Sequence, residues 1–282
     1  MPLSVIPSFL PQPDVDNYWI RANPNGAATG FTGGINSAIF RYSGAPIENS
    51  TTDDAADNLL AETSLIPLEN PGAPGNATVD GVDLAINLAL AFDAPDFEIN
   101  GVSFVPPTVP DLLQIISGTT AAADLLPAES VYALPLNSSI QLSFDATTVA
   151  AIGGPHPFHL HGHNFDVIRP QGSTDYNYVN PMRRKNLFSN PLSPRNPGDV
   201  VATGTGATTD NVTIHFMTDN AGRWFLHCHI EWHLEAGFAI MFAEDAVDAA
   251  AANPTPDDWD QLCPIYDSLT TSQLGGGGGP TT

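Results

Sequence analysis

Short runs of alternating hydrophobic and polar residues recur along the chain between turn residues. Two of the clearest runs cover 139–144 and 211–216. Successive side chains of a strand point to opposite faces, so both runs predict half-buried antiparallel strands. Their inward-facing side chains are Ile140, Leu142, Phe144, Val212, Ile214 and Phe216. The 26 prolines and 24 glycines leave few windows long enough for a helix, which favours an all-β sandwich.

The chain divides into a short first part and a long second part. Runs at 17–21 and 38–42 predict two strands, too few to close a domain. An alanine-rich stretch at 245–252 predicts a short helix, and the glycine run at 275–279 predicts disorder. We therefore expect four regions: a two-strand remnant at 1–45, a polar linker at 46–80, a β domain at 81–250 and a tail at 251–282.

The charge balance excludes some classes of partner. With 31 acidic and 8 basic residues the net charge is −23, which argues against binding to nucleic acid or anionic membranes. The longest apolar run, 84–92, is far shorter than the roughly 20 residues of a membrane span. Prolines interrupt the amino-terminal apolar run, so it does not resemble a signal peptide. Nevertheless, Asn-x-Ser/Thr triplets at Asn49, Asn76, Asn137 and Asn211 favour a secreted glycoprotein.

Seven of the eight histidines lie in two short segments, 156–163 and 227–233. In an extended segment His227 and His229 share one side, and Cys228 points to the other. The same alternation separates His156 from His159 and His161. We therefore expect two groups of side chains, one with the cysteine and one with two H-x-H pairs. His215, the histidine outside the clusters, lies on the polar side of its run, where a solvent or hydrogen-bonding role is expected.

The first group has the composition of a mononuclear copper site. His233 can return to Cys228 through a turn after Ile230, which gives with His156 the His₂Cys set typical of blue-copper electron-transfer centres. Zinc is the alternative, although a structural zinc site has four ligands and no second cysteine lies near Cys228. Phe238 stands where an axial ligand is expected and cannot coordinate, which would raise the reduction potential. The four imidazoles of the H-x-H pairs suit a multinuclear copper cluster.

The segments 156–163 (HPFHLHGH) and 224–238 (WFLHCHIEWHLEAGF) resemble the third and fourth copper motifs of fungal laccases, which are multicopper oxidases. The resemblance extends from about Asn17 to Asp267, including 100–108 (NGVSFVPPT). It implies a Greek-key β-sandwich of cupredoxin type. It also implies that His156, Cys228 and His233 bind a type 1 copper beside Phe238, that His159 binds a type 2 copper, and that His161, His227 and His229 bind a type 3 pair.

The resemblance implies a laccase reaction. A phenolic or aromatic amine substrate would give one electron to the type 1 copper, and the electron would pass through Cys228 to His227 and His229. Four such transfers would reduce O₂ to water at a trinuclear cluster.

The chain also departs from the family, whose members have three cupredoxin domains. The first domain supplies two H-x-H motifs that this chain lacks, so we expect a truncated chain holding the end of the second domain (1–45) and the third domain (81–250). A missing domain or a second chain would supply the remaining histidines. The disulfide partner that Cys263 has in the family is absent as well. The segment Lys185–Gly198 is an insertion, either a tolerated surface loop or retained non-coding sequence.

Other interpretations remain open. One is a single type 1 copper electron-transfer fragment without oxidase activity, and another is a fragment that does not fold. Ferroxidase and ascorbate oxidase are alternatives within the family. Glu231 and Glu235 either tune His233 and relay protons or serve the surface and packing, and Phe97 and Phe104 are expected in the core rather than at a substrate mouth.

Overall fold

The structure, a computed structural model, describes residues 17–21, 37–51, 72–125, 127–182, 199–204, 211–270 and 273. The chain forms two compact units, Met1–Ala61 and Glu62–Thr282. The predicted insertion Lys185–Gly198 and the glycine run 275–279 lie outside the described residues, as does the side chain of Cys263. Within the described part, no helix has the length and apolar character needed to cross a membrane.

The described part of the first unit contains the two predicted strands. β1 (Asn17–Arg21) pairs antiparallel with β2 (Ser37–Arg41). The Arg41 guanidinium donates to Asn17 Oδ1 over 2.8 Å, and Trp19 Nε1 donates to the Ser50 carbonyl over 3.1 Å. These side-chain bonds hold the pair to the segment that follows it.

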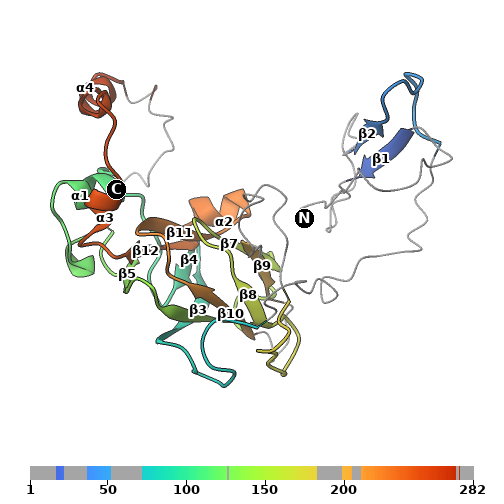
Figure 1. Ribbon diagram of the computed structural model, residues 1–282, viewed down its shortest axis with the longest axis horizontal. Coiled ribbons are helices and arrows are strands. Elements are labelled where there is room, and N and C mark those ends of the chain that lie inside the picture. The colour runs from blue at the N-terminus through green and yellow to red at the C-terminus, as the bar shows by residue number, and fades with distance from the viewer. Residues whose placement is uncertain are drawn as a thin grey trace. The chain divides into compact units, whose positions relative to one another are not determined.

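The second unit is a sandwich of two five-stranded sheets (Figure 1). The first sheet has the order β4-β3-β6-β10-β8 and the second has the order β5-β12-β11-β7-β9. The strands of the first sheet are β3 (Leu84–Asp93), β4 (Asp96–Ile99), β6 (Ser139–Asp145), β8 (Asp166–Arg169) and β10 (Asn211–Met217). Those of the second are β5 (Val131–Leu134), β7 (His156–Leu160), β9 (Val200–Thr203), β11 (Gly222–Cys228) and β12 (Ala239–Glu244). The expected all-β fold is confirmed.

The core lies between the sheets and contains the side chains that the alternation assigned to it. Phe144 on β6 packs against Phe158 on β7 with ring centroids 5.2 Å apart, which joins the two sheets. All six predicted inward-facing residues are at most 1% exposed. They are Ile140, Leu142, Phe144, Val212, Ile214 and Phe216.

The expectation that these two strands are only half-buried is wrong. The opposite face of β6 and β10 is covered by the segment 72–83, so Gln141 and His215 are also buried. Gln141 Nε2 donates to Asp80 Oδ1 over 3.0 Å. The ring nitrogens of His215 lie 3.0 Å from the Pro74 carbonyl and 2.9 Å from Gln141 Oε1. His215 thus has the expected hydrogen-bonding role, but at a buried position.

Short helices lie between strands and after the last strand, β12. The predicted alanine-rich helix is α3 (Ala249–Ala252). The alternation of residues gave no indication of the others, because each is only a few residues long. They are α1 (Asp111–Ile116), η2 (Ala122–Asp124), α2 (Glu231–Glu235), η3 (Trp259–Gln261) and α4 (Leu262–Asp267).

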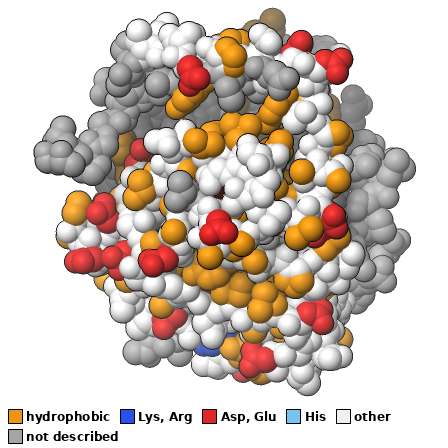
Figure 2. Space-filling view, turned by 90° about the vertical axis from the view of Figure 1, so that its left-hand side faces the viewer, with side chains coloured by type: hydrophobic (Ala, Val, Ile, Leu, Met, Phe, Trp, Pro, Cys, Tyr) orange, Lys and Arg blue, Asp and Glu red, His pale blue; other side chains and the backbone are white. Residues whose placement is uncertain are grey.

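The surface reflects the acidic composition. On the face in Figure 2, acidic side chains are scattered among hydrophobic and neutral ones, and basic side chains are nearly absent. A surface of this kind repels polyanions.

Removing the inter-sheet aromatic contact tests the core. We expect Phe144→Ala to lower the free energy of unfolding by about 3–5 kcal/mol, because it leaves a cavity at a fully buried site. Urea denaturation measures the change. Val179→Ala is the control: Val179 is 63% exposed, so a change of about 0.5 kcal/mol or less is expected. Equal effects of the two substitutions would contradict this account of the core.

The Asp83 carboxylate gives a pH-dependent contribution to stability. Its Oδ2 accepts hydrogen bonds from the Ser139 backbone N–H and from Ser139 Oγ, both at 2.8 Å. These bonds hold the pKa of Asp83 below its ordinary value of 3.8. A depressed carboxyl pKa stabilises the fold above the unfolded pKa, and this stabilisation is lost as the pH falls through the folded pKa.

We therefore expect Asp83→Asn to be destabilising at pH 6 and to approach the wild type as the pH falls below about 3.8. The difference in urea midpoint between the two proteins, measured across this range, checks the prediction. A difference that stays constant with pH would show that the charge of Asp83 is not involved.

Candidate metal centre

The segment His227–Cys228–His229 lies at the end of β11, a central strand of the second sheet. β11 is paired with β12 on one side and with β7 on the other. The register with β7 places His227 opposite His159, and Cys228 opposite Phe158. Since β7 also begins with His156, the pairing of these strands brings both histidine segments together.

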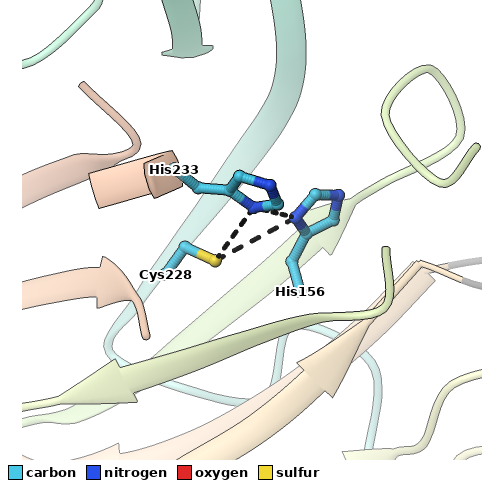
Figure 3. Close-up of side chains that lie close together, drawn as sticks. All are labelled: His156, Cys228 and His233. Atoms are coloured by element: carbon cyan, nitrogen blue, oxygen red, sulfur yellow. Dashed lines mark hydrogen bonds between the residues drawn. The ribbon is translucent and has the colours of Figure 1, made fainter. Parts of the chain in front are cut away.

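Cys228, His156 and His233 converge on one side of this strand (Figure 3). Cys228 Sγ lies 3.6 Å from His233 Nδ1 and 4.0 Å from His156 Nδ1, and the two Nδ1 atoms are 3.1 Å apart. His233 comes from α2, whose turn after Ile230 returns the chain toward the cysteine, as expected. Metal bonds to nitrogen and sulfur are about 2.0–2.3 Å long, so one ion can contact all three atoms.

The hydrogen bond of His156 prepares its Nδ1 atom for a metal. His156 Nε2 lies 3.1 Å from the Val149 carbonyl, which can only accept, so Nε2 carries the proton and Nδ1 presents its lone pair. Burial lowers the pKa of both His156 and His233 and thereby favours the neutral, metal-binding form. Burial also raises the pKa of the Cys228 thiol to about 11, so a metal has to displace its proton.

Aromatic side chains enclose this group. Phe238 is fully buried, with its ring 5.2 Å from that of His156. Phe97 stacks on Phe238 at 4.7 Å and packs on His233 at 4.5 Å. At 4% exposure Phe97 is a core residue, as expected, and Phe104 is 9% exposed. The contact between Phe97 and His233 joins β4 to α2, and no local sequence signal indicated it.

The four histidines of the two H-x-H pairs, His159, His161, His227 and His229, gather on the opposite side of β11. His161 Nε2 lies 3.0 Å from His227 Nε2, and the ring centroids of His159 are 4.5 Å from His161 and 5.8 Å from His229. Partial desolvation of the ring and the neighbouring imidazoles lower the pKa of His161 to about 4. All four rings therefore lie close enough to share metal ions. His161 and His229 are exposed, and His227 is buried.

Backbone carbonyls fix the tautomers here as well. His159 Nδ1 donates to the Asp199 carbonyl over 2.9 Å, and His227 Nδ1 donates to the Cys228 carbonyl over 2.9 Å. In both rings Nε2 is therefore unprotonated, and that of His227 faces His161 Nε2. Metal-binding histidines usually donate their second nitrogen to a carbonyl or carboxylate in this way, so the arrangement fits metal ligands.

Comparisons with known proteins agree with this geometry. Residues 104–248 match the family model described as "Multicopper oxidase". The chain belongs to the multicopper oxidase family.

Relatives within this family are fungal laccases, which confirms the resemblance in the sequence. A laccase of Phlebia radiata is 60% identical over 263 residues, covering 92% of this chain and 47% of the relative. A laccase of Trametes hirsuta is 59% identical over 257 residues, covering 91% and 46%. The chain thus spans about half the length of the curated relatives it matches.

The solved structure of the Botrytis aclada laccase supports the fold assignment. It matches with a TM-score of 0.60 and 24% identity, covering 92% of this chain and 46% of the laccase. The expected cupredoxin-type fold is therefore confirmed. The donor set, one thiol with six imidazoles in two groups, also fits copper, the metal of this family.

Gly153 provides a test of the first group. It has a φ of +71°, and a Cβ there would lie 2.7 Å from His233 Nε2. We expect Gly153→Ala to displace the His233 ring, because the added Cβ would collide with it. Copper binding should weaken by about 10–100-fold. Copper titration followed by the thiolate–copper absorption measures this.

Gly172→Ala is the matched control. Gly172 has a φ of +73°, and a Cβ there would have no atom within 4 Å, so alanine brings the same backbone strain without the contact. Equal copper affinities of the two variants would mean that the contact with His233 does not matter.

Proposed function

We propose that this chain acts as part of a laccase, which oxidises phenols or aromatic amines and reduces O₂ to water. Each substrate would lose one electron and one proton, and four substrates would convert one O₂ to two H₂O. The observation that carries the proposal is the division of one segment between two groups: Cys228 faces two imidazoles, and its neighbours His227 and His229 face two others.

In this proposal His156, Cys228 and His233 hold the type 1 copper, with Phe238 at the axial position as a non-coordinating residue. The Nδ1 atoms that flank Cys228 Sγ and the hydrogen bond that fixes His156 support this assignment. Bound copper would supply one-electron redox chemistry there. The buried aromatic rings of Phe97 and Phe238 exclude water and favour a high reduction potential.

His159 is assigned to a type 2 copper, and His161, His227 and His229 are assigned to a type 3 pair. The unprotonated Nε2 atoms of His159 and His227 support these roles. Six of the eight histidines of the chain are assigned as ligands, and the family resemblance requires four more histidines beyond these six. A preceding domain or a second chain would supply them. We assign residues 81–250 to the copper-carrying domain and 1–45 to the end of the domain before it.

The chain itself connects the two groups. His227 is covalently adjacent to Cys228, and its Nδ1 donates to the Cys228 carbonyl over 2.9 Å. The same segment therefore provides a short covalent and hydrogen-bonded path for electrons from the thiol side to the imidazole side. The acidic surface suits a secreted protein that acts on small phenols rather than on nucleic acid.

A second candidate function is a single-copper electron carrier without oxidase activity. It is favoured by the contrast between the two groups. Cys228 and His156 are buried, His233 is partly buried, and the three donors of this group are all present, whereas His161 and His229 of the other group are exposed.

Copper loading of the full chain distinguishes the two functions. We expect an intense thiolate–copper absorption band in the wild type that is absent from Cys228→Ser, because the band arises from the sulfur ligand. An oxidase binds more than one copper per chain and consumes O₂ with a phenol, whereas a carrier binds one copper and consumes none. His161→Gln should keep the band and lose O₂ consumption. A wild type without the band would refute both functions.

A further inference from the structure

His163 and Glu244 form a buried pair behind the four-histidine group. His163 is 6% exposed and Glu244 is fully buried, and His163 Nε2 lies 2.8 Å from Glu244 Oε2. Within the described residues neither of these two atoms has a hydrogen-bond partner elsewhere. Because a buried polar atom without a partner is costly, each of these two atoms depends on the other.

The pair lies where three parts of the second sheet meet. His163 follows β7 in the loop that carries His161, and Glu244 is the last residue of β12, opposite Gly222 of β11. The His163 ring also packs on Trp224 of β11, with centroids 5.7 Å apart. These contacts therefore hold the histidine loop against β11 and against β12, the strand beyond it.

Asn220 extends this connection. Its backbone N–H donates to Glu244 Oε1 over 2.7 Å, and its side chain donates to the Gly162 carbonyl over 3.1 Å. Gly162 has a φ of +73°, and any Cβ there would collide with the Trp224 ring. The loop can therefore approach β11 only with glycine at this position.

The loop determines where His161 lies. The His161 backbone N–H donates to the Phe225 carbonyl over 2.9 Å, and its Nε2 faces His227 Nε2 at 3.0 Å. The Cys228 group does not depend on this loop, since its ligands come from the start of β7, the end of β11 and α2.

We propose that His163 and Glu244 are positioning residues for the four-histidine group. The pair holds the loop 161–163 against β11 and β12 so that His161 faces His227, and it leaves the Cys228 group unaffected. This inference rests on the proposed function, in which the four histidines bind copper.

The test uses the full chain with His163→Gln and Glu244→Gln. In the copper-free protein we expect the His161 amide to exchange its hydrogen about tenfold faster or more, because either substitution replaces the strong bond between imidazole and carboxylate by a weaker one. The Cys228 amide, which donates to the Phe238 carbonyl over 3.0 Å, should be unchanged. On copper titration, binding beyond the Cys228 group should weaken by about 10–100-fold while the thiolate–copper band is kept.

His215→Gln is the matched control, because it alters another buried histidine. The His163 ring packs on Phe216 of β10, whereas His215 lies on the opposite face of that strand. It should leave hydrogen exchange at the His161 and Cys228 amides, and copper binding by both groups, as in the wild type. If His163→Gln does not fold, the same measurements on two other variants decide whether the pair positions the loop. These are Glu244→Gln and Asn220→Ala, of which the second removes only the bond to the Gly162 carbonyl.

Two results would overturn the inference: a His161 amide that exchanges as in the wild type, or equal acceleration at His161 and Cys228, which indicates general loosening. Absence of copper at the four histidines of the wild type would refute the proposed function instead, and the exchange comparison would still decide whether the pair positions the loop.

Discussion

The alternation of side chains along a single β-strand is the constraint on which this structure depends. At the end of β11, three consecutive residues place a thiol on one face and two imidazoles on the other. Pairing with β7 and β12 fixes this strand on both sides, so the direction of each side chain is set by backbone hydrogen bonds. The two candidate metal groups are therefore adjacent because the chain is extended there.

Hydrogen bonds to backbone carbonyls fix the orientation of three imidazole rings that the strand alternation brings together. Three carbonyls, those of Val149, Asp199 and Cys228, each accept a hydrogen bond from one ring nitrogen and thereby leave the lone pair of the other nitrogen available to a metal. These bonds orient imidazoles before any metal binds, which is how the surroundings of a metal site commonly increase its affinity. Burial of the rings acts in the same direction, because it keeps them neutral.

Much of this arrangement followed from the sequence. Strand alternation placed His156 with Cys228 and grouped the two H-x-H pairs, and the structure brings the same side chains together. Alternation is local, so residues in one short run are enough to infer it. The same reasoning failed for β6 and β10, because it gave no indication that the segment 72–83 covers their polar faces.

The contacts that hold the histidines in place could not be predicted from the sequence, because they join residues far apart in the chain. Phe97 and Asp199 reach their histidines from strands and loops far away in the chain, and Glu244 reaches His163 across the sheet. Such contacts depend on how the strands are ordered, which no local pattern specifies. The resemblance to laccases indicated the ligands but not these partners.

X-ray absorption at the copper edge, on the full chain loaded with one equivalent of copper, identifies the atoms that bind the metal. One sulfur and two imidazole nitrogens are expected as the close neighbours of the copper, from Cys228, His156 and His233. A copper surrounded by nitrogen or oxygen alone, with no sulfur neighbour, would contradict it.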